Sequence, residues 1–263
     1  MTENSTNQPA NSRFDGQVAL ITGSGKGMGR SHAETLAARG ARIVVQDVDR
    51  AAAEETADSL RAAGGDPILA IADVSDVGAF AEAIRAVEAA AGRIDILVNN
   101  AGIAGGSPAM EEIDEANYDR MFDVHVKGAF FATKAVLPGM KARGGGKIVN
   151  IASVAAMGAV GSRAHYCAAK GAVLAMTKSW ALEFAPWKIN VNCVSPGWVM
   201  TPMVHAVTTA EWRKTHIDAE IPLGRYAEPW EVSALVAFLC SAEADFITGQ
   251  TVSPNGGQVI VGI

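Results

Sequence analysis

Short apolar runs alternate with longer helical patterns along most of the chain, from Gln17 almost to the C-terminus. The apolar runs cover residues 18–22, 42–46, 67–72, 94–99, 147–152 and 189–194, and a last short run lies near Thr251. Runs such as Ile96-Leu97-Val98 are apolar at consecutive positions, as expected for strands that are buried on both faces. Strands that alternate with helices predict a parallel sheet covered by helices.

Helix limits follow from capping residues and glycines. Asp49 and Ser75 are the predicted N-caps of two helices that stop at Gly64-Gly65 and at Gly92. Further helices are expected over residues 114–142, 164–185, 208–220 and 229–241. Because residues 14–263 contain no linker or repeat, we expect a single α/β domain: a three-layer, doubly wound (Rossmann-like), mostly parallel sheet of seven strands. Such sheets bind ligands at the carboxyl ends of the strands, where the strand order reverses.

Composition and charge exclude several classes of protein. The chain has 22 basic and 28 acidic side chains, a formal net charge of −6, so it lacks the basic surface that nucleic-acid binding needs. Its three cysteines are far apart and no histidine stands at metal-ligand spacing, so we expect neither a disulfide framework nor a metal site. Residues 1–13 are expected to form a disordered leader rather than a signal peptide, and no uncharged stretch is apolar enough to span a membrane. These features predict a cytoplasmic protein.

A glycine-rich turn follows the first expected strand and opens a helix. Its sequence, Thr22-Gly-Ser-Gly-Lys-Gly-Met-Gly29, has the spacing TGxxxGxG, which lets backbone N–H groups approach a pyrophosphate at the positive end of the helix. The patterns GxGxxG and P-loop do not fit, because Met28 and Arg30 stand where a third glycine is needed and Gly27 follows Lys26. Taken alone, the turn also fits a tight strand-to-helix connection that binds no ligand. The candidate cofactor-binding residues here are Gly23, Gly25, Lys26, Gly27, Met28 and Gly29.

Asp47, followed by Val48, stands at the end of the second expected strand. A carboxylate at this position can accept hydrogen bonds from both hydroxyls of an adenosine ribose and repels a 2′-phosphate, which favours NAD over NADP. Lys26 favours NADP instead, because its ammonium can pair with a 2′-phosphate. It loses this role if it is solvated or paired with Asp47. Asp47 also fits a plain turn-forming role.

More candidates for a nucleotide site follow the third and fourth expected strands. Asp73, with Val74 beside it, can accept a hydrogen bond from an adenine amino group. The small residues in Asn100-Ala101-Gly102 let a dinucleotide pass close to the backbone. Each group alone also fits turn chemistry. Their places at consecutive strand ends favour one extended nucleotide site.

Tyr166 and Lys170 are the candidate catalytic pair. Their i, i+4 spacing near the start of a helix places the phenol and the ammonium on one face. A cation near a tyrosine favours the ionised form, so Lys170 can tune Tyr166 as an acid and base. Ser153 follows the fifth expected strand, where its hydroxyl can bond a substrate oxygen. The YxxxK spacing alone also occurs on ordinary amphipathic helices.

Together, these motifs resemble the classical short-chain dehydrogenase/reductase family in order and spacing: TGxxxGxG at 22–29, Asn99-Asn-Ala-Gly102, Ser153, Tyr166 with Lys170, and Pro196-Gly197. The resemblance covers about residues 15–257. It implies that Tyr166 exchanges a proton with the substrate oxygen, that Ser153 orients this oxygen, and that Lys170 holds the nicotinamide ribose and lowers the tyrosine pKa. It also implies a cofactor that carries the hydride and whose path is lined by Asn100, Gly102, Pro196, Gly197, Val199 and Thr201.

One position departs from the family pattern. Where the family has an asparagine that helps to hold water in a proton relay behind the lysine, this chain has His125. Histidine can also bond a water or a carbonyl, but its charge changes with pH. A purely structural buried role fits His125 equally well, so it is a candidate relay member.

The walls of a substrate pocket are expected from residues 103–110, 154–161 and 198–221. These loops have few charges and supply apolar side chains, which favours a hydrophobic ketone or secondary alcohol; the candidates are Met157, Trp198 and Met203. Residues 198–222 are expected to form a substrate lid. We interpret Arg163 and His165, beside Tyr166, as surface groups. The family resemblance implies a homotetramer built on the two long helices.

The resulting hypothesis is an NAD(H)-dependent oxidoreductase that interconverts a secondary alcohol and a ketone, without nucleic-acid or membrane partners. The alternative is an NADPH-dependent 3-oxoacyl-[acyl-carrier-protein] reductase, which Lys26 allows. An acidic carrier needs basic residues near the end of the Tyr/Lys helix, where Lys188 is the only cation. A dinucleotide-binding sensor without turnover is a third hypothesis, and the intact Ser153, Tyr166 and Lys170 argue against it.

Overall fold

The computed structural model describes residues 13–158 and 161–260; the expected leader over residues 1–13 therefore lies outside the described residues, apart from Arg13. Within this part of the chain, seven strands form one sheet in the order β3-β2-β1-β4-β5-β6-β7, and every pair is parallel. The strands are β1 (Val18–Thr22), β2 (Arg42–Asp47), β3 (Ile68–Ile71), β4 (Ile96–Asn99), β5 (Gly146–Ile151), β6 (Ile189–Val194) and β7 (Thr251–Val252). The prediction of a doubly wound, Rossmann-like sheet is confirmed.

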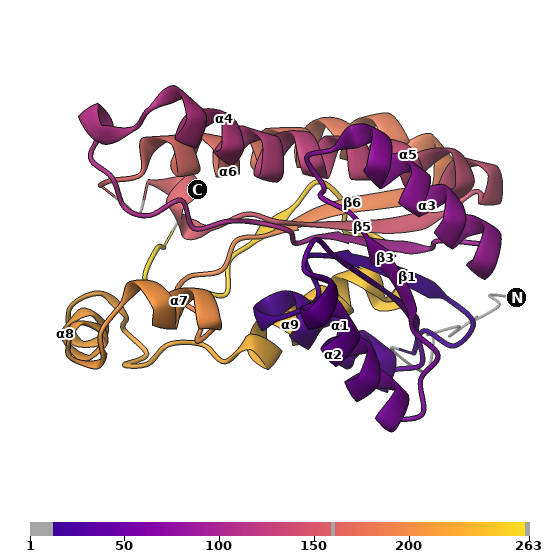
Figure 1. The fold of residues 1–263 in the computed structure, drawn as a ribbon, viewed down its shortest axis with the longest axis horizontal. Coiled ribbons are helices and arrows are strands. Elements are labelled where there is room, and N and C mark those ends of the chain that lie inside the picture. The colour runs from indigo at the N-terminus through magenta and orange to yellow at the C-terminus, as the bar shows by residue number, and fades with distance from the viewer. Residues whose placement is uncertain (1–12, 159–160, 261–263) are drawn as a thin grey trace, which may run out of the picture.

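Helices cover both faces of the sheet, which makes three layers (Figure 1). One face carries α1 (Gly27–Ala38), α2 (Arg50–Ala62) and α9 (Pro229–Cys240), and the other carries α3 (Val77–Ala91), α5 (Gly128–Arg143) and α6 (Ala164–Phe184). The remaining helices are α4 (Glu115–Phe122), α7 (Pro202–Val207) and α8 (Ala210–Glu220). None of the helices in the described residues has the length and apolar character that a membrane crossing requires.

The apolar strands divide their side chains between two cores. In β1, Ala19 and Ile21 pack with Leu36 of α1, while Val18 and Leu20 face the opposite core. This alternation explains why the run is apolar at every position: both faces of a central parallel strand are covered. Since β1 pairs with β2 on one side and β4 on the other, the strand order reverses between β1 and β4, and ligands of this fold bind beside that point.

Two predicted helix limits are wrong. Asp49 caps α2 as predicted, but the N-cap of α3 is Asp76, whose carboxylate accepts a hydrogen bond from the Ala79 N–H at 3.0 Å. The predicted cap, Ser75, instead donates to Asp73 at 2.7 Å. The expected helix over 114–142 is interrupted by a π-helical turn at Asp123–Lys127, which joins α4 to α5.

The segment after β6 contains a helix that the pattern did not predict. Thr201 caps α7 by accepting a hydrogen bond from the Val204 N–H at 3.4 Å, and Pro202 occupies the first turn, where its missing N–H has no cost. The next helix, α8, begins at Ala210 rather than at 208, because the Thr209 side chain accepts a hydrogen bond from the Trp212 N–H at 3.1 Å. These caps divide the expected lid into two helices.

His32 is fully buried where α1 packs against α9. Its Nδ1 lies 2.7 Å from the Ser233 hydroxyl, and its Nε2 has no hydrogen-bond partner among the described residues. Burial lowers the pKa of His32 to about 3. The folded chain therefore holds this imidazole neutral, whereas the unfolded chain protonates it near pH 6.5.

We expect acid to destabilise the fold through His32. Between pH 6.5 and 3 the unfolded state binds the extra proton, so the free energy of unfolding falls as the pH falls, by about 2 kcal/mol between pH 7 and pH 5. Urea unfolding at both pH values would measure this difference, and His32→Asn should reduce it. The exposed His205 gives the control, because His205→Asn should leave the pH dependence unchanged. Equal slopes in the native chain and His32→Asn would contradict the assignment.

Candidate active site

A cleft of about 560 Å³ runs across the carboxyl ends of β1 to β5. The structure places most of the predicted site residues along it: Gly23, Lys26, Gly27, Met28, Gly29, Asp47, Val48, Asp73, Val74, Asn100, Ala101, Gly102, His125, Tyr166, Lys170, Thr201 and Met203. They come from seven segments that are distant in the sequence. No group of three or more histidine, cysteine, aspartate or glutamate side chains within residues 13–158 and 161–260 is arranged to hold a metal ion.

The glycines of the first turn serve two purposes. Gly29 packs against the protein itself, because a Cβ atom there would collide with the carbonyl oxygen of Gly23. Gly27 has a φ of +60°, and a Cβ atom there would make only ordinary contacts, with Pro202 and Thr201 at 3.8 Å. At Gly27, therefore, backbone N–H groups of the first turn of α1 are accessible from the cleft, and free N–H groups at a helix start attract phosphate.

Two polar side chains hold this turn in place. Gln46 is buried in β2; its Oε1 accepts a hydrogen bond from the Gly23 N–H at 3.3 Å, and its Nε2 donates to the Ala72 carbonyl at 2.7 Å. The Thr22 hydroxyl accepts from the N–H groups of Asn100 and Ala101, both at 3.0 Å. Thr22 was predicted only as the first residue of the glycine-rich turn, and Gln46 was not predicted. A polar side chain inside an apolar strand is the signal that could have found Gln46.

Asp47 lies at the adenosine end expected for a dinucleotide. Its Oδ2 accepts a hydrogen bond from the Gly25 N–H at 2.8 Å, and its Oδ1 accepts from the Asp49 N–H at 3.0 Å. Lys26 is not paired with Asp47: its Nζ lies 3.6 Å from the Asp49 carboxylate, and its side chain is 67% exposed. The cation in the turn is thus partly neutralised by Asp49, while the carboxylate of Asp47 remains in the cleft wall.

Asp73 has partners that the sequence did not reveal. Its Oδ1 accepts from the Ser75 hydroxyl, and its Oδ2 accepts from Arg120 at 3.1 Å. Burial acts to raise the pKa of Asp73, but these hydrogen bonds outweigh it and the pKa is lowered. Asp73 is therefore a charged, well-anchored carboxylate. No sequence signal points to Arg120, because only the fold brings α4 next to the end of β3.

Tyr166 and Lys170 lie at the other end of the cleft. The Lys170 Nζ is buried and donates a hydrogen bond to the Ile151 carbonyl at 2.8 Å, and it lies 5.9 Å from the centre of the Tyr166 ring. Burial lowers the pKa of Lys170 to about 8. Burial also raises the pKa of Tyr166, opposed by hydrogen bonding with Ser153. The protein groups alone therefore do not produce the lowered tyrosine pKa that the sequence analysis expected.

His125 belongs to the π-helical turn and is buried beside Tyr166, with ring centres 5.5 Å apart at an angle of 87°. Its Nε2 lies 3.1 Å from the Ile103 nitrogen and 3.0 Å from the Ile103 oxygen. Burial, together with the charge of Lys170, lowers the pKa of His125 well below its usual value. The imidazole is therefore neutral near pH 7.

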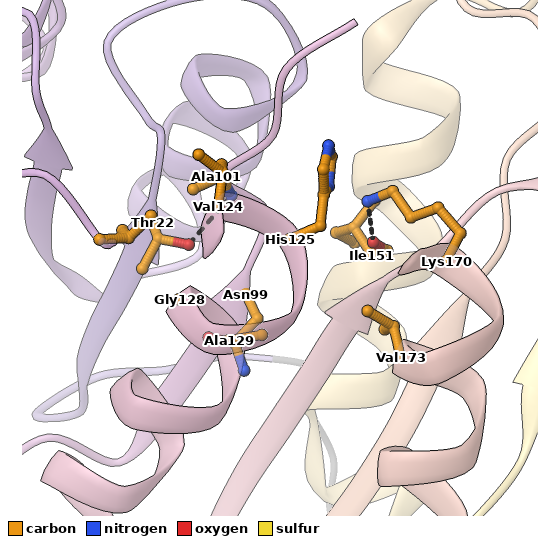
Figure 2. Close-up of a pocket in the computed structure, with 11 residues that line it drawn as sticks. Thr22, Asn99, Ala101, Val124, His125, Gly128, Ala129, Ile151, Lys170 and Val173 are labelled. Carbon is orange, nitrogen blue, oxygen red and sulfur yellow. Dashed lines mark hydrogen bonds between the residues drawn. The ribbon is translucent and has the colours of Figure 1, made fainter. Parts of the chain in front are cut away.

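A small cavity of about 10 Å³ lies behind the cleft, with His125, Asn99 and Lys170 in its wall (Figure 2). Such a volume accommodates about one water molecule. His125 Nδ1 and Asn99 Oδ1 are both buried, and neither has a hydrogen-bond partner among the described residues. A buried polar atom without a protein partner is one that an ordered water can satisfy.

Several predicted site residues lie outside the cleft wall. Gly25, Pro196, Gly197 and Val199 do not line it; Val199 is buried in a core, and a Cβ on Gly197 would press on Asn255. Met157 and Ser153 do not line it either; they lie in the segment after β5, where the Ser153 hydroxyl accepts from the Ala155 N–H at 3.2 Å.

Trp198 and His165 have different surroundings from those predicted. The Trp198 ring packs 5.4 Å from Trp212 and 5.0 Å from His216, between centres, so it holds α8 rather than lining the cleft. His165 is buried rather than on the surface, and its Nε2 lies 2.9 Å from the Asn117 amide oxygen. Aromatic and imidazole groups next to motif residues were misassigned because local sequence does not show which helix packs on them.

The sequence was compared with known proteins. The family model described as enoyl-(acyl carrier protein) reductase matches residues 23–258. A cyclohexanol dehydrogenase from Acinetobacter sp. (strain SE19) is 36% identical over 244 residues, which cover 93% of this chain and 95% of that protein. The chain belongs to the short-chain dehydrogenase/reductase family. This family member is accordingly an oxidoreductase that acts on alcohol or ketone groups of small molecules, and its cofactor class is NAD(P).

Solved structures of similar proteins share the fold of this short-chain dehydrogenase/reductase. A gluconate 5-dehydrogenase from Burkholderia cenocepacia J2315, in complex with NADP and tartrate, has a TM-score of 0.89 and 37% identity, covering 94% of this chain and 96% of that one. A 3-oxoacyl-[acyl-carrier protein] reductase from Brucella melitensis with bound NAD has a TM-score of 0.86 and 32% identity, covering 95% and 94%. Similar folds thus hold either cofactor, and the choice depends on this chain's own residues.

Proposed function

We propose that the chain is an NAD(H)-dependent oxidoreductase that interconverts a secondary alcohol and a ketone with a largely hydrophobic body. The observation that carries the proposal is a single cleft with Asp47 at one end and Tyr166 and Lys170 at the other. This arrangement matches a dinucleotide whose ribose meets a carboxylate and whose reactive end meets an acid–base pair.

The cleft fits the cofactor at three places. Gly27 leaves the start of α1 open to a pyrophosphate, Asp47 offers a carboxylate to the adenosine ribose, and Lys170 presents an ammonium near Tyr166. The bound nicotinamide supplies or accepts the hydride. Asp47 acts against a 2′-phosphate by charge repulsion, since its neighbour Lys26 is already paired with Asp49. These contacts support NAD as the cofactor.

Tyr166 moves the proton in this proposal. Its ionised oxygen takes the proton from the substrate alcohol during oxidation, and the protonated phenol gives it back during reduction, while Ser153 orients the substrate oxygen by a hydrogen bond. Burial keeps the phenol protonated in the protein alone, because it outweighs the hydrogen bonding of Ser153 and the charge of Arg163, which both act to lower the pKa of Tyr166. The low pKa of Lys170 means that the charge of its ammonium is sensitive to pH near 8.

We also propose that His125 holds a water behind Lys170. The water bonds His125 Nδ1, which has no partner among the described residues, and Lys170 lies in the wall of the same cavity (Figure 2). A neutral imidazole can either donate to or accept from this water, whichever nitrogen carries the proton. His125 thereby acts as a positioning residue for the Lys170 ammonium.

His125→Leu should lower kcat by roughly tenfold, less than the loss of a direct acid–base group because His125 acts through Lys170, and should shift the pH profile of kcat. The leucine fills the space but cannot bond the water. His125→Asn restores a polar group and should recover most of the activity and the native pH profile. Steady-state kinetics from pH 6 to 10 measure both. A loss in both variants with an unchanged pH profile would show a packing role only.

The segment 198–222 is proposed as the substrate lid. Thr201, Pro202 and Met203 border the cleft, and Trp198 ties α8 to the body of the lid. We propose a homotetramer through α5 and α6, whose outer surfaces expose apolar side chains: Phe130 is 43% exposed and Leu182 82%. Cross-linking followed by mass measurement tests the assembly.

The NADPH-dependent 3-oxoacyl reductase stays an alternative, because Lys26 is exposed at the turn. A screen of secondary alcohols with NAD and with NADP, followed by absorbance of the reduced cofactor, separates the hypotheses. Oxidation with NAD supports the proposal. Turnover restricted to NADPH and a 3-oxoacyl carrier would establish the alternative, and tight cofactor binding without any turnover would establish a sensor.

A further inference from the structure

Arg163 has an unusual backbone and lies beside Tyr166, although it does not itself line the cleft. It directly precedes α6 with φ 62° and ψ 46°, a left-handed conformation that favours glycine and strains a bulky residue. Its N–H donates to the Pro108 carbonyl at 3.3 Å, which ties it to the expected pocket wall at residues 103–110. Arg163 thus lies between two loops of the substrate side, immediately before the helix that carries Tyr166.

The guanidinium of Arg163 lies over the reactive tyrosine. Its Cζ is 5.4 Å from the centre of the Tyr166 ring. Its Nε is buried without a hydrogen-bond partner, and no carboxylate among residues 13–158 and 161–260 forms an ion pair with it. Arg120, in contrast, is paired with Asp73 across the same cleft. An arginine held in a strained loop beside the chemistry, with its donors unused by the described residues, is available for a ligand.

Charges are unevenly distributed along the cleft. The carboxylates in its wall, Asp47, Asp49 and Asp73, gather at the ends of β2 and β3, where Lys26 and Arg120 pair with Asp49 and Asp73. At the opposite end, Lys170 lines the wall and Arg163 covers Tyr166. The positive charge of Arg163 also acts to lower the pKa of Tyr166, against the larger effect of burial. The reactive end therefore attracts an anion.

We propose that Arg163 binds a carboxylate of the substrate and so selects hydroxy acids and oxo acids over neutral alcohols and ketones. The proposal rests on the function proposed above and narrows its substrate class: a hydrophobic body that carries one carboxylate a few bonds from the reacting carbon. A guanidinium suits this task, because its planar donors match the two oxygens of a carboxylate. Arg163 is then a specificity-determining residue, while Tyr166 performs the proton transfer.

Matched pairs of substrates test the proposal. The probes are 3-hydroxybutanoate and 4-hydroxypentanoate, each compared with its methyl ester, so that only the negative charge differs. With NAD, the native enzyme should show at least a tenfold higher kcat/KM for the better acid than for its ester. Arg163→Gln should lower kcat/KM for the acid by 10- to 100-fold and change the ester by less than threefold. Arg163→Lys should retain part of the preference, since it keeps the charge without the planar fork.

Lys188→Gln provides the matched control. Lys188 is the other non-glycine residue with positive φ in the described chain, at 56°, and it follows the far end of α6. This variant removes a cation from a left-handed position away from Tyr166 and should leave the acid-to-ester ratio unchanged. Arg163→Gly relieves the backbone strain and should lose the acid preference as Arg163→Gln does.

The outcomes separate this proposal from the function on which it rests. Equal kcat/KM for acid and ester in the native enzyme, or equal losses of both in Arg163→Gln, would overturn the role of Arg163 while leaving the oxidoreductase intact. If neither probe is oxidised, a thermal-shift measurement of binding tests the role of Arg163 instead. With NADH present, the acid should raise the Tm of the native protein and not that of Arg163→Gln. An acid that raises neither Tm, or both alike, would overturn the proposal.

Discussion

Tyr166→Phe is expected to lower kcat for a secondary alcohol by about 10²- to 10⁴-fold, the range that one positioned acid–base group contributes. Phenylalanine keeps the ring that contacts His125 and Arg163 but removes the only hydroxyl of that side chain. The cofactor should therefore still bind, because Lys170 retains its bond to Ile151. Stopped-flow absorbance of the reduced cofactor measures the rate, and fluorescence titration with NADH measures binding.

Tyr118→Phe is the control for this substitution. Tyr118 lies on α4, is 45% exposed and stacks on Phe122 with ring centres 4.6 Å apart, so losing its hydroxyl should leave kcat within about twofold. Full activity of Tyr166→Phe with a good ketone would show that another group moves the proton. Loss of NADH binding along with activity would instead show that the variant disrupts the site as a whole.

The sheet was predictable because its strands are buried on both faces. Strands β1 and β6 begin and end where the apolar pattern predicts, at Val18–Thr22 and Ile189–Val194. Strand β4 begins at Ile96 rather than at residue 94, and the Asp95 side chain anchors this strand end: its Oδ2 accepts a hydrogen bond from the Val18 N–H at 2.9 Å. The apolar pattern indicates which residues are buried. It does not identify a polar residue that anchors a strand end.

The helix limits and the support of the site depend on contacts across the fold. Ser75 and Asp76 are both good N-caps by type, and the choice was decided by Asp73, which takes the Ser75 hydroxyl. The π-helical turn that positions His125 has no local sequence signal. Residues that lie on strand ends were therefore predictable, whereas Gln46 and Arg120, which reach neighbouring strand ends, were not.

The glycines of the motifs suggested more positions of close cofactor approach than the structure supports. A Cβ on Gly102 would crowd the His125 ring, and one on Gly29 would meet the Gly23 carbonyl, so both glycines are required by packing within the protein. Gly27 differs, since its neighbours leave room on the cleft side. The spacing TGxxxGxG therefore encodes mainly the shape of the turn, and one open glycine in it offers the approach to a phosphate.

Asp47 should make the native enzyme prefer NADH over NADPH by at least about 100-fold in Kd, because a carboxylate against a 2′-phosphate costs several kcal/mol. Asp47→Asn removes the charge and keeps an acceptor for the Gly25 N–H, which Oδ2 now bonds at 2.8 Å. The ratio of the two Kd values should fall by tenfold or more. Fluorescence titration with both nucleotides measures it.

Asp49→Asn separates the charge of Asp47 from that of its neighbour. Asp49 pairs with the exposed Lys26 at 3.6 Å, and an exposed pair contributes little, so this variant alone should change the ratio by less than about threefold. In the Asp47→Asn background the same change frees the Lys26 ammonium for a 2′-phosphate and should bring the two nucleotides close to parity. A native protein that binds NADPH more tightly, or an Asp49→Asn effect as large as that of Asp47→Asn, would show that the carboxylate after β2 does not set the cofactor preference.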